Sequence, residues 1–132
     1  MTEGGSQGQT EVFEYLAHEK PRPGQVEMIR ESTEALRSRG YHLAAAPTGI
    51  GKTAAALSAA LEITQKSPTK KHVFFLTSRQ SQHRIVVDTV RRINQRRVGK
   101  EPITLVDMIG QSGMCVQPFA KESNLVFSMM CS

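Results

Sequence analysis

The stretch Ala46-Pro47-Thr48-Gly49-Ile50-Gly51-Lys52-Thr53 decides how the surrounding sequence is interpreted, because it fits the phosphate-binding pattern Ala/Gly-x-x-x-x-Gly-Lys-Ser/Thr. Gly49 and Gly51 let the backbone turn successive N–H groups toward phosphate oxygens. A helix that begins near Lys52 adds the positive end of its dipole to the same anion. We expect Lys52 to reach the β- and γ-phosphates of a nucleotide and the Thr53 hydroxyl to ligate Mg²⁺.

Apolar patterns on either side of this loop predict an α/β fold. Apolar residues recur at helical spacing in three segments, which predicts helices over 25–39, 52–66 and 80–97. Three shorter apolar runs are typical of buried strands, over 41–46, 72–76 and 103–106. Alternating helices and strands indicate a short parallel sheet flanked by helices. Gly40 stands where the first helix needs a cap, and no regular pattern remains beyond Gly110.

Length and composition indicate one globular unit of 132 residues, with 39% hydrophobic and 22% charged residues. The chain shows neither a signal peptide nor an apolar run long enough to span a bilayer. We therefore expect a soluble protein without membrane contact, cytoplasmic or nuclear. The expected organisation is a flexible polar tail over 1–12, an ATP-binding domain over 13–110 and a further segment over 111–132.

Positive charge is concentrated in the second half of the sequence. The net charge is +5, and the densest stretch of basic residues is 79–100, where Asp88 is the only acid. Such a patch neutralises phosphates in nucleic-acid-binding proteins. It is equally typical of a solvated helix face, and composition alone leaves both interpretations open.

Four segments in this order resemble the N-terminal part of one helicase family. They are Arg22-Pro23-Gly24-Gln25, the loop 46–53, Leu76-Thr77-Ser78-Arg79 and Gly113-Met114-Cys115-Val116. Together they are similar to the XPD-type family, the iron–sulfur DNA helicases of superfamily 2. Two positions depart from the usual pattern: Ile50 replaces a Thr or Ser, and Gln80 replaces a Thr.

The resemblance implies a partial RecA-like P-loop NTPase domain and assigns roles to residues of this chain. Gln25 would help to read the adenine of ATP, and Thr77, Ser78 and Arg79 would grip a DNA backbone, single-stranded or forked. Cys115 would be the first ligand of an iron–sulfur cluster in the complete protein, and Cys131 a candidate second ligand, so the segment 111–132 would be the truncated start of the iron–sulfur cluster segment. Four thiolates hold such a cluster. The implied cofactors are ATP, Mg²⁺ and that cluster, and the implied process is DNA repair.

A carboxylate for Mg²⁺ is the main element that the sequence does not supply clearly. No adjacent Asp-Glu pair occurs, and Asp107, after the third expected strand, is the one candidate. Asp107 is more typical of a strand-end or turn residue than of a magnesium ligand. We therefore expect an N-terminal fragment of an ATP-dependent DNA helicase that hydrolyses little or no ATP alone. The alternatives are a small non-motor P-loop module that binds nucleotide and an inactive remnant.

Overall fold

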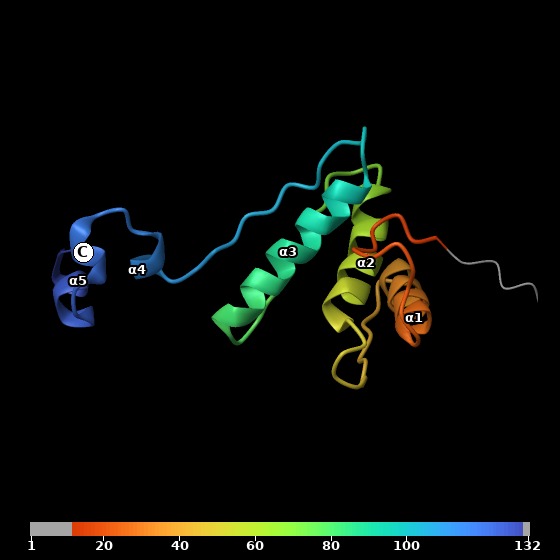
Figure 1. The fold of residues 1–132 in the computed structure, drawn as a ribbon, viewed down its shortest axis with the longest axis horizontal. Coiled ribbons are helices and arrows are strands. Elements are labelled where there is room, and N and C mark those ends of the chain that lie inside the picture. The colour runs from red at the N-terminus through yellow and green to blue at the C-terminus, as the bar shows by residue number, and fades with distance from the viewer. Residues whose placement is uncertain (1–11, 131–132) are drawn as a thin grey trace, which may run out of the picture.

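Three long helices organise the computed structural model, which describes residues 12–130 (Figure 1). They are α1 (Gln25–Arg37), α2 (Lys52–Gln65) and α3 (Gln80–Arg96). Shorter elements follow: α4 (Gln111–Met114), the 3-10 helix η1 (Pro118–Lys121) and α5 (Asn124–Met130). The three helices predicted from apolar spacing are confirmed, and each begins at the predicted residue. The expected tail over 1–12 lies outside the described residues except for Val12.

The hydrophobic core forms where α2 packs against α1 and α3. Three buried alanines of α2 leave room for larger side chains from its neighbours: Ala54, Ala55 and Ala59. Ile29 comes from α1 and Ile93 from α3, and the short segment 15–17 closes the core from the N-terminal side. Removal of this apolar surface from water is the main favourable term in folding.

The predicted parallel sheet is wrong: residues 12–130 contain no β-strand. The three segments expected to form it are irregular, and many of their apolar side chains face solvent. Leu43 is 94% exposed, Phe74 84% and Leu76 89%. The core is therefore built from helices, not from helices that cover the two faces of a sheet.

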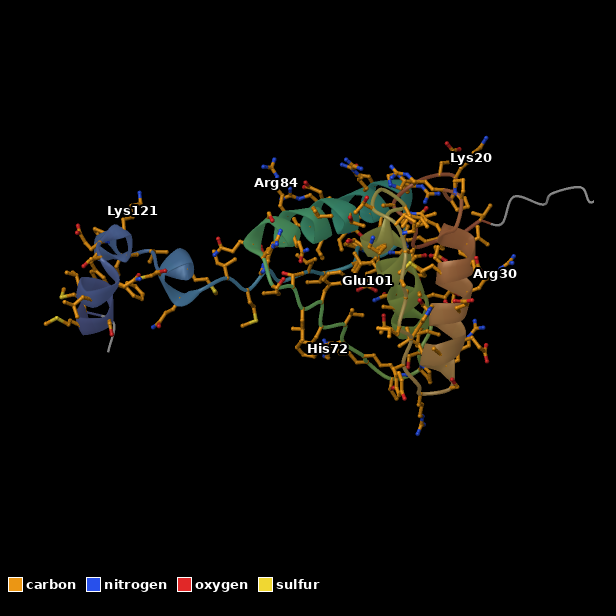
Figure 2. All side chains as sticks on the ribbon, turned by 90° about the horizontal axis from the view of Figure 1, so that it is seen from below. Lys20, Arg30, His72, Arg84, Glu101 and Lys121 are labelled. Carbon is orange, nitrogen blue, oxygen red and sulfur yellow. The ribbon has the colours of Figure 1, made fainter. Side chains whose placement is uncertain are left out.

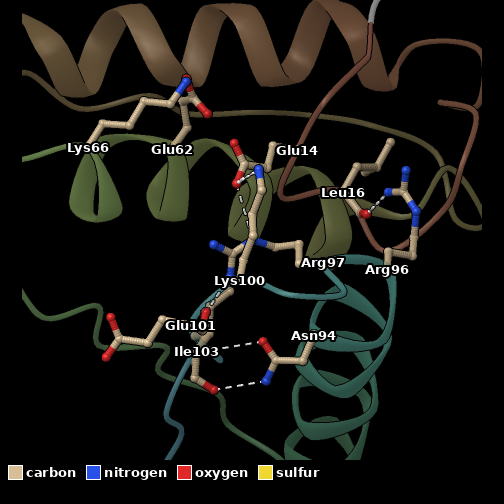
Figure 3. Close-up of polar contacts among 10 residues, drawn as sticks. All are labelled: Glu14, Leu16, Glu62, Lys66, Asn94, Arg96, Arg97, Lys100, Glu101 and Ile103. Atoms are coloured by element: carbon tan, nitrogen blue, oxygen red, sulfur yellow. Dashed lines mark hydrogen bonds and ion pairs between the residues drawn. The ribbon is translucent and has the colours of Figure 1, made fainter.

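Side-chain contacts hold two of these segments to neighbouring helices, and in one of them they take the place of strand pairing. The amide of Asn94, on α3, donates to the Ile103 carbonyl at 3.0 Å and accepts from the Ile103 N–H at 2.9 Å (Figure 3). His42 lies 3.0 Å from the Ser32 hydroxyl and 3.4 Å from the Glu31 carboxylate, both on α1. Backbone groups must find partners somewhere. An apolar run predicts that side chains are buried. A β-strand also needs a neighbouring strand to pair with its backbone N–H and C=O groups.

The end of α1 differs in one detail from the expectation that Gly40 caps it. The Gly40 N–H does close the helix end, because it donates to the Ala35 carbonyl at 2.8 Å. However, the residue in the left-handed conformation is Arg39, with φ of 57°. A side chain in this region is strained, and glycine normally occupies it.

The C-terminal elements lie apart from α1–α3 in Figure 1, joined to them by an extended segment. The sequence pattern did not predict them. Phe119 of η1 and Phe127 of α5 pack with ring centroids 6.3 Å apart. The Ser123 hydroxyl accepts from the Val126 N–H at 3.4 Å, as a helix N-cap does. None of the helices within residues 12–130 is long and apolar enough to cross a membrane.

Candidate nucleotide-binding site

The loop before α2 has the backbone that its glycines were expected to provide. Gly49 and Gly51 have φ of 88° and 86°, and Gly51 is the N-cap of α2. No acidic residue lies in the first turn of α2. The N–H groups of a first helical turn have no partner within the helix, and the positive end of the dipole lies there. The start of α2 is therefore a favourable place for a phosphate.

Lys52 reaches back over the loop. Its Nζ donates to the carbonyls of Ala46 and Pro47, each at 2.9 Å, and its side chain remains exposed. An ammonium group has three N–H donors. Two of them are held by the loop, so the third is left to meet an anion. Thr53, the next residue of α2, is partly buried.

Gln25 and Arg22 fasten the start of α1 to this loop. Gln25 is fully buried, its Nε2 donates to the Gly51 carbonyl at 3.2 Å, and its Oε1 accepts from the Arg22 N–H at 2.9 Å. The Arg22 guanidinium donates to the Gly49 carbonyl at 2.8 Å. The structure therefore places Gln25 against the phosphate-binding loop, which is where a residue of a nucleotide site is expected to lie. Sequence reasoning assigned no role to Arg22, although it lies in the quoted motif.

Close approach between α1 and the loop depends on two glycines. A Cβ at Gly24 would lie 2.5 Å from Cδ1 of Ile50, and a Cβ at Gly51 would lie 2.4 Å from Nε2 of Gln25. Gly24 also has a positive φ, of 80°. The unusual Ile50 thus packs against the turn that precedes α1, which keeps the two segments in contact.

The predicted DNA-binding residues lie at the start of α3. The Thr77 hydroxyl donates to the Arg79 carbonyl at 3.3 Å, and Arg79 is the N-cap of α3 with extended backbone. The side chains of Ser78 and Arg79 are exposed. Figure 1 shows α2 and α3 beginning at the same end of the molecule. The segment 77–79 and the phosphate-binding loop are therefore at one end of the helical core.

Asp107, the candidate magnesium ligand, contacts a histidine instead of the phosphate-binding loop. Its Oδ1 lies 2.6 Å from Nδ1 of His83, on the first turn of α3. The two side chains line a pocket together with Arg84, Asp88 and Arg91. Sequence reasoning did not predict this pair, because its two members are brought together only by the return of the chain along α3.

The cysteines do not form a metal site in the part of the chain that the structure describes. Cys115 is a free, partly buried thiol just after α4, and Cys131 lies outside the described residues. No cluster of three or more His, Cys, Asp or Glu side chains occurs within residues 12–130. Because a cluster needs four thiolates and the sequence has two cysteines, this chain does not fit an iron–sulfur cluster by itself.

Comparison with known protein families found a match to one family. Residues 18–129 match the family described as type III restriction enzyme, res subunit. Searches of curated proteins and of solved structures found no match. The matched family is of the helicase type and uses a nucleotide with Mg²⁺, which agrees with a superfamily 2 assignment, whereas the XPD-type relationship has no support. Since the match covers most of the sequence, the chain belongs to the family of type III restriction enzyme res subunits.

Proposed function

We propose that this chain binds ATP with Mg²⁺ through residues 46–53, as part of an ATP-dependent DNA helicase. The observation that carries the proposal is the geometry of the loop. Two left-handed glycines lead into the free N-terminus of α2, with the Lys52 ammonium held over the turn. Lys52 contributes its third N–H to a phosphate oxygen, and Thr53 contributes its hydroxyl to the magnesium ion.

Gln25 acts on both the loop and the base in this proposal. Its amide uses one N–H and one lone pair inside the protein, and its remaining N–H and lone pair meet an adenine edge once nucleotide binding opens this buried position. The inner contacts fix the amide so that the remaining groups have a defined direction. Gln25 thereby couples the recognition of the base to the shape of the phosphate-binding loop.

The segment 77–79 is proposed to bind the backbone of single-stranded or forked DNA. Ser78 and Arg79 are exposed at the N-terminus of α3, where hydroxyl, guanidinium and backbone N–H donors gather. These are the groups that contact phosphates in nucleic-acid complexes. Residues 13–110 form the ATP-binding part in this proposal, 111–132 begin a separate segment, and the protein acts in the cytoplasm or nucleus.

Hydrolysis by this chain alone is expected to be slow. Asp107 contacts His83, which disfavours it as the second magnesium ligand that hydrolysis normally requires. The same contact disfavours the alternative of a small non-motor module, which needed Asp107 at the metal ion. No catalytic step is assigned to an iron–sulfur cluster, because the chain lacks two of the four thiolates.

The direct test is equilibrium binding of a fluorescent ATP analogue with Mg²⁺ to the chain and to Lys52→Ala. A charged hydrogen bond contributes about 1.5–3 kcal/mol, so the variant should bind at least about 10-fold more weakly. Lys66→Ala is the matched control, because Lys66 lies at the far end of α2 and pairs with Glu62. Equal affinity of Lys52→Ala and the unchanged chain would refute the proposed site.

A further inference from the structure

The solvent-facing side of α3 carries four arginines, which we call the α3 basic face: Arg84, Arg91, Arg92 and Arg96. Helical spacing places them on one side, opposite the buried Val86, Val90 and Ile93. Arg84 and Arg91 contact Asp88, at 3.8 and 3.4 Å, on this exposed surface. Arg92 makes no hydrogen bond or ion pair with any residue in 12–130, so its charge is available to a partner.

Arg97 is not part of the α3 basic face, because its side chain packs inside the protein. Its guanidinium lies 4.7 Å from the ring centroid of Tyr15 and 3.3 Å from the Glu14 carboxylate, and its side chain is largely buried. Its charge is therefore used within the fold. The arginines of the basic stretch thus divide into Arg97, whose charge is used within the fold, and an exposed set, of which Arg96 also bonds the Leu16 carbonyl.

The basic face continues onto the segment before α1. The Arg96 guanidinium donates to the Leu16 carbonyl, which brings the last turn of α3 against this segment (Figure 3). Burial lowers the pKa of His18, and the positive charges of Arg22, Arg92 and Arg96 lower it further. Charges from two separate parts of the chain therefore add to one positive potential around His18.

Figure 2 shows how far the positive surface extends. Arg84, near the start of α3, and Lys20, beyond its other end, stand on one edge of the part that holds α1–α3, whereas His72 is on the other edge. The helix of 17 residues is about 25 Å long, enough for several nucleotides. Arg79 caps the first end of α3, and in the last turn Arg96 bonds the Leu16 carbonyl.

We propose that the α3 basic face binds the phosphodiester backbone of a nucleic-acid strand and leads it from residues 77–79 along the helix toward His18. This inference rests on the proposed function and names the surface that the strand follows. Exposed, weakly compensated guanidinium groups favour phosphates, because they release condensed counterions and donate paired hydrogen bonds. Arg22, whose charge acts on His18 and whose guanidinium bonds the Gly49 carbonyl, then joins the strand-binding surface to the loop that binds ATP.

The decisive experiment measures binding of a fluorescein-labelled oligothymidylate to the full chain by anisotropy over a range of salt. For single strands the salt slope is about 0.7 per phosphate contact, so losing one contact weakens binding about 5-fold near 0.1 M salt. Arg92→Ala should show this loss and a slope smaller by about 0.7, and Arg92→Lys should recover most of the affinity. Asp88→Asn should bind more tightly, because it frees Arg84 and Arg91.

The control is Lys70→Ala/Lys71→Ala, which removes two charges next to His72 on the other edge and should change affinity less than 2-fold, or about 0.4 kcal/mol. If the unchanged chain binds no oligonucleotide, the proposed function fails and this inference fails with it. If Arg79→Ala weakens binding while Arg92→Ala and Asp88→Asn do not change it, only this inference fails. Polyglutamate binding as tight as oligothymidylate binding would identify an acidic peptide as the partner and would also overturn it.

Discussion

The side-chain amide of Gln25 uses both of its ends inside the protein, one on Arg22 and the other on Gly51. Gln25→Ala removes both hydrogen bonds and leaves a cavity at a fully buried position. We expect the free energy of unfolding to fall by about 2–3 kcal/mol, since each hydrogen bond contributes about 1 kcal/mol and the lost packing adds to it. Urea denaturation measures this change. Gln65→Ala, at the exposed end of α2, should stay within about 0.5 kcal/mol of the unchanged chain.

Gly51 and Gly49 provide a matched pair of substitutions. Both have a positive φ near 87°, so alanine is strained at either by about 1–2 kcal/mol. A Cβ at Gly51 also meets Gln25, whereas one at Gly49 meets nothing within 4 Å. Gly51→Ala should therefore destabilise the chain more than Gly49→Ala does. In a chain that also carries Gln25→Ala, the two glycine substitutions should lower the free energy of unfolding equally. If Gly51→Ala still destabilises that chain more than Gly49→Ala does, Gln25 does not hold the loop.

The residues of the site could be predicted where they belong to one short stretch of sequence. Gly49, Gly51 and Lys52 lie within one short motif whose backbone demands are specific. The contact of Gln25 with Gly51 joins positions far apart in the sequence, and only the family resemblance suggested that they share a site. The pairing of His83 with Asp107 has no such signal, because either side chain alone is ordinary for an exposed position.

At the level of elements, the end of α1 contains a strained residue, and replacing that residue should stabilise the chain. Arg39 adopts φ of 57°, while the following Gly40 N–H bonds to Ala35. Arg39→Gly relieves the strain at some cost in chain entropy, so the free energy of unfolding should rise by about 0.5–1 kcal/mol. Thermal denaturation followed by circular dichroism measures it. Arg37→Gly, inside the last turn, should have the opposite sign, and the same sign for both would contradict this account.

The helices were predictable and the sheet was not, for a physical reason. A helix pairs its backbone groups within itself, so the spacing of Val86, Val90 and Ile93 contains most of the needed information. A strand requires a partner elsewhere in the chain. Phe74 has the composition of a buried strand residue but remains exposed, and Ile103 takes its hydrogen bonds from the side chain of Asn94. Composition alone cannot reveal that a side chain takes the place of a neighbouring strand.

At the scale of the whole molecule, the end of α3 is fastened to the segment before α1 by charged contacts. Glu14 accepts from Lys100 at 2.8 Å and from Arg97 at 3.3 Å (Figure 3). Arg97 stacks on Tyr15, and Arg96 bonds the Leu16 carbonyl. These contacts link positions about 80 residues apart. They hold the N-terminal segment over the core, and with it Arg22 near the phosphate-binding loop.

This fastening makes stability depend on pH in two windows. The hydrogen bond from Lys100, with that from Arg97, holds the pKa of Glu14 below its ordinary value of 4.5, although burial opposes the shift. Burial and three arginines lower the pKa of His18 below 6.5. In both cases the unfolded chain binds a proton more readily than the folded chain does, so stability falls as pH falls. The loss begins near 6.5 for His18 and near 4.5 for Glu14.

Melting temperatures recorded at stepped pH should therefore decline in two stages on acidification, the first below pH 6.5 and the second below 4.5. His18→Asn should remove the first stage, because asparagine does not titrate in this range. Glu14→Gln should lower the melting temperature at neutral pH and flatten the second stage, since the amide can still accept hydrogen bonds but carries no charge to lose. A single decline that neither substitution changes would place the pH-sensitive groups elsewhere in the chain. The ionisation of Glu14 and His18 would then contribute little to stability.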